Sequence, residues 1–207
     1  MRKDHSLRAM VVAALLLLAA CSPPAVPDVT YFRMPAPTPL PHSAKPLSAL
    51  PIEVEVFTGE GIYAEQAVIY STSPDGGALR TYHYHLWSDP PTRALQARLT
   101  TALRESGISA LVTDRLPASD QALRIRGRIL RYERVERGEK AYDVHVAFEM
   151  RVEQDSGEPL IEQTYEAQAS AGDATMAATV RAFAAAVDEA FGKFYADLSR
   201  LESGHAG

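Results

Sequence analysis

Three successive segments of the chain have apolar or small residues at almost every second position. They span residues 123–129, 144–152 and 161–169, and arginine, glutamate and glutamine fill many of the positions between. A period of two is typical of strands that bury one face and expose the other. The connections at 137–140 and 155–158 have hairpin length and contain glycine. We therefore predict an antiparallel meander with one wet face.

A long amphipathic helix is predicted after the meander, with Asp173 placed to cap it. A shorter helix is predicted to begin near Pro91, with Ser88 or Asp89 as its cap, and to end at Gly107. The stripe of the long helix consists of apolar residues three or four positions apart: Met176, Val180, Phe183, Val187, Phe191, Phe194, Leu198 and Leu201. We predict an α+β fold, in which two amphipathic helices, the second C-terminal, pack on one side of an antiparallel sheet built of a meander and hairpins.

Further strands are predicted before the meander. Residues 67–72 and 78–85 form a hairpin across the turn at 73–77, and a short strand lies at 108–112. The folded domain is predicted to begin at residue 51 and to end at 203, with a tail at 204–207. Its first strand alternates buried Ile52, Val54 and Val56 with outward-facing Glu53, Glu55 and Phe57.

The N-terminal residues 1–20 have the parts of an export signal. A basic start is followed by an apolar stretch, Ala9 to Ala20, and the run Leu18-Ala19-Ala20-Cys21 reads as a lipobox. The twelve apolar residues would make a helix of about 18 Å, which is short of a hydrocarbon core of about 30 Å. We therefore predict cleavage between Ala20 and Cys21 rather than a membrane span.

Cys21 is predicted to carry the lipid. An ordinary signal peptide with a chance cysteine and a buried core cysteine are the competing interpretations, and neither explains why Cys21 directly follows Leu-Ala-Ala and precedes serine and proline. Two acyl chains are enough for stable anchoring on a bilayer. Ser22 stands where an aspartate would favour retention at the inner membrane. The bacterial sorting rule therefore favours a lipid-anchored protein on the periplasmic face of the outer membrane.

Residues 21–50 are predicted to form a proline-rich tether, because prolines remove backbone donors and favour extended chain. At about 3.1 Å per residue, such a tether reaches as far as roughly 90 Å. The aromatic and apolar island Tyr31-Phe32-Arg33-Met34 is the exception, and we predict that it docks on the domain.

Composition excludes several classes of function. The formal net charge is −5, and the loss of Arg2, Lys3, Arg8 and Asp4 with the signal leaves −7, which disfavours nucleic-acid binding. Cys21 is the only cysteine, so the chain has neither an internal disulfide nor a thiolate metal site.

We predict no enzyme, no metal and no cofactor. Neither a nucleophile elbow nor a phosphate loop nor a dinucleotide fingerprint occurs in the sequence. His83 and His85 would point the same way on a strand, but no third ligand is fixed beside them. The cluster Tyr82 to Trp87 is therefore predicted to serve packing or a partner interface.

Arginines recur on the first meander strand, and three of them share one face of the sheet. The favoured interpretation is pairing with glutamates of neighbouring strands. The alternative is docking to an acidic partner. The residues concerned are Arg124, Arg126, Arg128 and Arg131, with Glu149, Glu153, Glu162 and Glu166 as the expected counter-ions.

The order of these features resembles the ABC-type transport auxiliary lipoproteins, the PqiC/YmbA family. The likeness rests on the lipobox, the proline-rich segment, Tyr31-Phe32-Arg33-Met34, Ile52-Glu53-Val54 and Trp87-Ser88-Asp89-Pro90-Pro91. Phe32 and Met34 depart from the Tyr-Tyr-x-Leu patch of the family, and both suit a packing role.

This resemblance implies a non-enzymatic outer-membrane component of an MCE-type intermembrane lipid transport system. Its partners would be a periplasmic MCE-domain protein and, through it, an inner-membrane permease and ATPase. Assembly of the chain into a homo-oligomeric ring is also implied. The residues expected to supply packing or the partner surface are Tyr31, Phe32, Tyr82, Tyr84 and Trp87.

Two other classes of function stay open. A lipid- or small-ligand-binding module would need an apolar pocket between the sheet and the terminal helix. A structural envelope adaptor would act outside transport and would not associate with an MCE protein.

Overall fold

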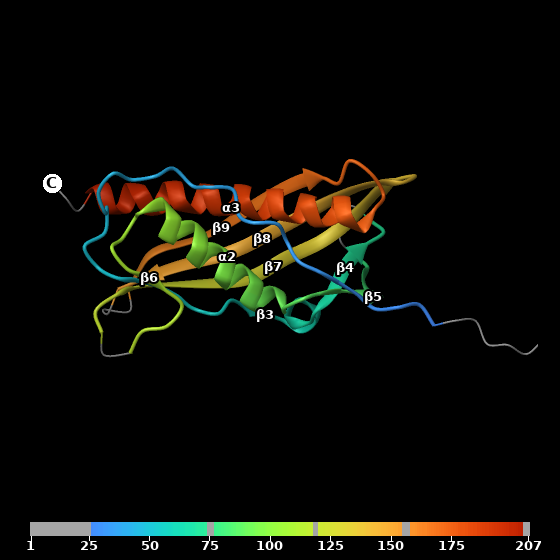
Figure 1. Cartoon of the computed structure of the whole chain (residues 1–207), viewed down its shortest axis with the longest axis horizontal. Coiled ribbons are helices and arrows are strands. Elements are labelled where there is room, and N and C mark those ends of the chain that lie inside the picture. Colours follow the sequence, from blue (N-terminus) through green and yellow to red (C-terminus); the bar gives the residue numbers. More distant parts are fainter. Residues whose placement is uncertain (1–25, 74–76, 118–119, 155–157, 205–207) are drawn as a thin grey trace, which may run out of the picture.

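The computed structural model describes residues 26–204 except for 74–76, 118–119 and 155–157. Nine strands form one sheet, and helices α2 and α3 lie on the same face of it (Figure 1). The elements are β1 Thr30–Phe32, β2 Ile52–Val54, β3 Thr58–Gly59, the short 3-10 helix η1 Gly61–Ala64, β4 Ala67–Ser71, β5 Leu79–Trp87, α2 Pro91–Ser106, β6 Val112–Thr113, β7 Leu123–Gly138, β8 Ala141–Glu153, β9 Pro159–Ser170 and α3 Met176–Gly204. The predicted α+β class is confirmed.

Some predictions fall outside the described residues. These are the signal 1–20, the cleavage site at Ala20 and Cys21, the tips of the turns at 73–77 and 155–158, and the end of the tail at 205–207.

The predicted meander forms the wide part of the sheet. Strand β7 pairs with β8 and β8 with β9, both antiparallel, and α3 packs on β8 and β9. The inward residues of β8 are buried at every second position, as the alternation predicts: Val144, Val146, Phe148, Met150 and Val152. The hairpin of β4 and β5 also forms, with antiparallel pairing.

The remaining pairings make the sheet mixed rather than antiparallel throughout. Strands β2, β3 and β4 each run parallel to β7, and β1 runs parallel to β5. Strands β2, β3 and β4 are far from β7 in the sequence, and helix α2 comes between them in chain order. A local pattern of alternation identifies a strand but does not specify such long-range partners, so the parallel part was not predicted.

The first predicted strand is interrupted after Val54. Strand β2 ends there, Val56 is exposed and Phe57 is buried, which reverses the expected directions of the last two residues. The ring of Phe57 lies over Gly127 of β7, in the space that a Cβ at position 127 would occupy. Because Gly127 has no side chain, the ring of Phe57 can pack in the core between Phe148 and Phe191.

Both predicted helix caps were wrong in detail. Pro90 occupies the N-cap of α2, and no side chain caps that helix, because Ser88 Oγ donates to Asp89 instead. At the start of α3, Thr175 Oγ1 accepts from the backbone N–H of Ala178 at 3.1 Å. Asp173 lies before this cap, and its carboxylate accepts from the N–H of Thr175 at 2.7 Å. Among the described residues, no helix is both long and apolar enough to cross a bilayer.

Candidate functional site

The proline-rich segment lies along the domain instead of leaving it. Residues 33–50, here called the strap, follow β1 and run past both helices (Figure 1). Backbone N–H groups of Ser43 and Leu47 donate to the carbonyls of Ser106 and Ile108, and the hydroxyl of Tyr195 donates to the carbonyl of Pro41 at 2.7 Å. Any free tether is therefore confined to the residues before the strap and β1.

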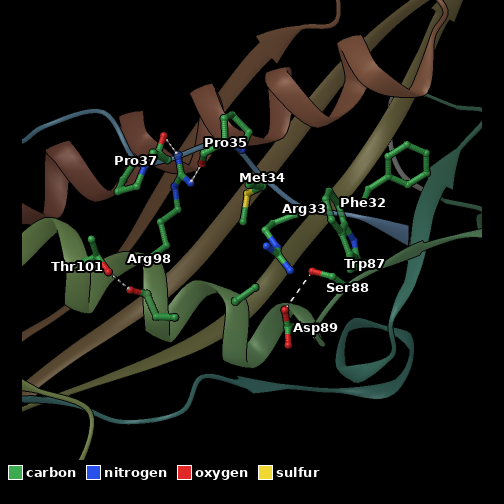
Figure 2. A pocket seen from close by; sticks show the side chains of 13 residues that line it. Phe32, Arg33, Met34, Pro35, Pro37, Trp87, Ser88, Asp89, Arg98 and Thr101 are labelled. Carbon is green, nitrogen blue, oxygen red and sulfur yellow. Dashed lines mark hydrogen bonds between the residues drawn. The ribbon is translucent and has the colours of Figure 1, made fainter. Parts of the chain in front are cut away.

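A buried ion pair fixes the first part of the strap. The guanidinium of Arg98 on α2 donates to both carboxylate oxygens of Asp188 on α3, at 2.7 and 2.8 Å. It also donates to the carbonyl of Pro35 at 2.6 Å (Figure 2). Asp188 in turn accepts from the N–H of Thr38 at 2.8 Å. Because proline has no backbone N–H, the strap has few donors of its own, and Arg98 supplies donors to two of its carbonyls, those of Pro35 and Ala36. One charge pair thus joins two helices and the strap.

A groove of about 250 Å³ lies between the strap and the first half of α2. Phe32, Met34 and Trp87 line it (Figure 2), and α2 contributes Ala94 and Ala97. The small alanine side chains leave the space open.

Of the five residues expected at a packing or partner surface, Trp87 and Phe32 point inward. Trp87 is 4% exposed and packs edge-on against Phe183, with ring centroids 5.1 Å apart. Phe32 is partly buried and meets the ring of His85 edge-on at 5.6 Å. Both side chains help to fasten β1 to the core.

Tyr82 belongs to an internal cluster around Arg134. Its hydroxyl accepts from the Arg134 guanidinium at 2.5 Å, and that guanidinium stacks on Tyr142 with 3.5 Å to the ring centroid. Burial raises the pKa of Tyr82 despite the nearby positive charge. Arg134 also donates to the carbonyl of Ala174, just before α3. Tyr82 therefore joins β5, β7 and the start of the helix.

Tyr31 and Tyr84 are the exposed members of the predicted set. Tyr31 on β1 is 62% exposed and Tyr84 on β5 is 38% exposed. The structure thus separates the five residues into three that pack and two that face outward.

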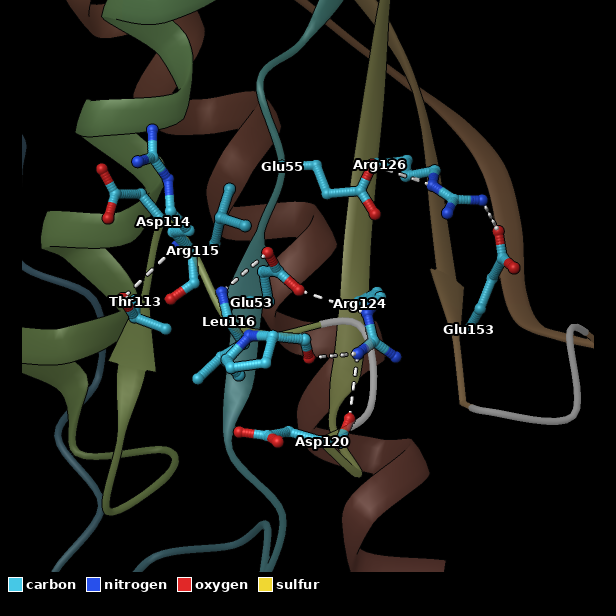
Figure 3. Close-up of polar contacts among 12 residues, drawn as sticks. Glu53, Glu55, Thr113, Asp114, Arg115, Leu116, Asp120, Arg124, Arg126 and Glu153 are labelled. Atoms are coloured by element: carbon cyan, nitrogen blue, oxygen red, sulfur yellow. Dashed lines mark hydrogen bonds and ion pairs between the residues drawn. The ribbon is translucent and has the colours of Figure 1, made fainter.

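The arginines of β7 are paired on the outer face of the sheet. Arg126 bridges Glu55 and Glu153, at 3.0 and 2.6 Å, as Figure 3 shows. Arg128 holds Glu149 through two contacts near 3 Å and thereby lowers the pKa of that carboxyl. Glu153 and Glu149 are counter-ions that the sequence predicted.

Two further pairs use carboxylates that the sequence did not predict. Arg124 pairs with Glu53, which also accepts from the N–H of Leu116, and Arg131 pairs with the buried Glu133 (Figure 3 shows the first). A register shift after Ile129 keeps Arg131 on the outer face. The contacts favour cross-strand pairing over docking to an acidic partner for Arg124, Arg126 and Arg128, whereas Arg131 pairs within its own strand.

Sequence reasoning missed Arg98 and Asp188. Each residue borders the apolar stripe of its helix, and a charged residue at that place is only weak evidence of a buried ion pair. No local pattern indicates that two residues ninety positions apart pair with each other. No group of three or more acidic, histidine or cysteine side chains suited to a metal occurs within the part of the chain that the structure describes.

A family model described as the ABC-type transport auxiliary lipoprotein component matches residues 34–192, which is well over half of the chain. The chain belongs to this family. The matched region begins at Met34 in the strap, just after β1, so most of the strap lies within the family domain. Members are lipoprotein components of transport systems, which makes this chain a membrane-anchored envelope protein. A comparison with curated proteins finds no match.

Solved structures support the same fold. A protein of Xanthomonas campestris from the DUF330 family has a TM-score of 0.73 at 17% identity, over 86% of this chain and 99% of its own. An uncharacterized protein has a TM-score of 0.62 at 15% identity, over 84% of this chain and 98% of its own. A hypothetical protein of Chlamydia trachomatis has a TM-score of 0.50 at 8% identity, over 74% of this chain and 98% of its own. At such identities the likeness shows the fold alone.

Proposed function

We propose that this protein is a non-enzymatic lipoprotein that docks a periplasmic MCE-domain protein at the outer membrane. The MCE protein would connect it to an inner-membrane permease and ATPase that move lipid between the membranes. Membership of the auxiliary lipoprotein family carries the proposal. The ion pairs that engage the arginines of the sheet face fit a scaffold better than a site for acid–base chemistry.

Cys21 is the proposed anchor, and Ala20–Cys21 the proposed cleavage site. Replacement Cys21→Ala removes the thiol that would carry lipid, so the variant is expected to leave the outer-membrane fraction of a density gradient. Ser22→Asp is the matched variant for sorting and is expected to move the protein to the inner-membrane fraction. A Cys21→Ala protein still found in the outer membrane would contradict the anchor.

Affinity purification from detergent-solubilised envelope tests the partners. The expected result is co-purification of an MCE-domain protein, with its permease and ATPase in lower yield. Recovery of the intact lipoprotein with none of these three would contradict the docking role and favour a structural envelope adaptor. Light scattering on the same preparation tests the proposed ring, which requires a mass that is a multiple of the monomer.

Binding of a lipid or small ligand is the second candidate, and the groove beside the strap favours it, although this groove lies against α2 and not between the sheet and the terminal helix, where a pocket was expected. The groove is apolar, and the indole N–H of Trp87, which lines it, has no hydrogen-bond partner among the described residues. Its volume of about 250 Å³ lies below the range of about 300–1,000 Å³ usual for small-molecule sites, so docking is preferred. Native mass spectrometry with extracted phospholipid tests binding. Ala97→Phe is expected to abolish an adduct that Ala196→Phe, on the exposed side of α3, retains.

A further inference from the structure

Several exposed large apolar side chains lie at one end of the molecule. Val26, Val29, Tyr31 and Tyr84 belong to the segment leading into β1, to β1 itself and to β5. In Figure 1 this segment, in blue, leaves the molecule at the β4–β5 end, whereas α3 ends at the opposite end. Leu111, another exposed apolar residue, lies beside β6 at that opposite end.

Strand pairing brings two of these side chains onto neighbouring strands. Tyr31 is the partner of Leu86 in the parallel β1–β5 pair, and Tyr84 lies two residues before Leu86. Val29 directly precedes β1, so Val29, Tyr31 and Tyr84 are exposed on the segment leading into β1, on β1 itself and on the adjacent strand β5. Phe32, the neighbour of Tyr31, instead meets the ring of His85 and is partly buried against the core. We call Val29, Tyr31 and Tyr84 the outer patch.

The position of the lipid restricts which end of the domain faces the bilayer. Tyr31 follows Cys21 by only ten positions. Even fully extended, this segment spans at most about 35 Å. Helix α3, with 29 residues, is about 43 Å long and runs away from the β4–β5 end (Figure 1). A lipid on Cys21 therefore holds the β1–β5 end, and not the β6 end, next to the membrane.

We infer that the outer patch rests on the bilayer that holds the lipid of Cys21. The inference depends on the proposed anchor. Tyrosine suits this position, because its ring enters the boundary between headgroups and acyl chains while its hydroxyl stays hydrated. Three side chains are too few to bind a membrane alone. The short tether raises their effective concentration at the surface, so the contact forms only in the lipidated protein. The β6 end then points into the periplasm.

Single-cysteine labelling tests this orientation. Cys21 is the only native cysteine and its thiol would be blocked by lipid, so each introduced cysteine is a unique thiol. Full-length lipidated variants Tyr31→Cys and Tyr84→Cys are labelled with an environment-sensitive fluorophore and reconstituted in vesicles of phosphatidylethanolamine and phosphatidylglycerol. Leu111→Cys, which replaces a side chain 48% exposed, is the matched control.

The labels at 31 and 84 are expected to emit at shorter wavelength than the label at 111. Spin-labelled lipid should quench them several-fold more strongly. Equal responses at all three positions, or stronger quenching at 111, would overturn the orientation. Sedimentation of the same vesicles distinguishes a failure of this inference from a failure of the anchor. If the protein sediments with the vesicles but the labels at 31 and 84 emit as they do in water, only this inference is contradicted. If the lipidated protein does not sediment with the vesicles, both the anchor and the inference are contradicted.

Discussion

A side chain at position 127 would collide with the ring of Phe57. A Cβ built on Gly127 overlaps three carbons of that ring, and Phe57 is buried between two other phenylalanines. The ring has no free space into which to move, because protein interiors are close-packed.

Gly127→Ala is therefore expected to lower the free energy of unfolding by about 1–3 kcal/mol, the usual effect of overpacking. Urea denaturation measures it. Gly192→Ala on α3 is the control, since a Cβ there meets nothing within 4 Å. Alanine favours helix by about 1 kcal/mol over glycine, so this control should be at least as stable as the wild type. Equal stability of Gly127→Ala and the wild type would contradict the packing described for Phe57.

His145 is the residue whose titration is expected to affect stability near neutral pH. Burial, with a contribution from Arg131, lowers the pKa of His145 below 6.5 in the folded protein. As the pH falls through 6.5, the unfolded chain takes up the proton first, so the folded state loses stability below that pH.

Replacement His145→Gln removes this loss. The wild type is expected to lose more unfolding free energy between pH 7.5 and pH 5.5 than the variant, in urea titrations at both values. His83→Gln, at an exposed histidine of β5, is the matched control. An identical pH dependence of the unfolding free energy in the wild type and in His145→Gln would show that protonation of His145 does not affect stability.

At the scale of elements, the strap is held chiefly where the two helices meet. Arg98 and Asp188 are both largely buried, and together they engage Pro35 and Thr38 of the strap. Removing one member of a buried pair leaves a desolvated charge without its partner.

Arg98→Met is expected to cost roughly 3–5 kcal/mol of unfolding free energy. It is also expected to speed hydrogen exchange in strap residues 38–43, because the strap loses its anchor. Mass spectrometry of exchanged peptides measures the second effect. Arg128→Met, which breaks a more exposed pair with Glu149, is the control and should leave exchange in the strap unchanged. Unchanged strap exchange in Arg98→Met would mean that the other strap contacts suffice.

On the scale of the whole molecule, Trp87 reports on the core. It is the only tryptophan, and it packs against Tyr132 and Phe183, which belong to the sheet and to α3. Both long helices and most strands share one continuous core, so unfolding should occur in one cooperative step. The denaturation midpoints from Trp87 fluorescence and from far-ultraviolet circular dichroism are expected to coincide. A fluorescence midpoint at clearly lower denaturant would instead reveal separate unfolding of the region around β1, the groove and α2.

The parts of this molecule that the sequence predicts are those whose pattern is local. Alternation along β8 and the apolar stripe of α3 depend only on neighbouring residues, and both appear as expected. The parallel partners of β7 and the pair Arg98–Asp188 join distant segments, and no local pattern records them. Of the five residues expected at a packing or partner surface, the sequence did not show which would be buried. The pattern identifies an aromatic strand but not which face of that strand the core covers.

The parallel pairing of β2 with β7 has a consequence for the order of folding. Ile52 of β2 pairs with Leu123 of β7, and β3 and β4 also have parallel pairing partners in β7. A chain that emerges with its N-terminus first, from a ribosome or across a membrane, therefore cannot complete its early strands until β7 has followed. Contacts between distant segments form slowly. Such a chain stays unfolded, and thus able to pass through a narrow channel, until most of it has been delivered.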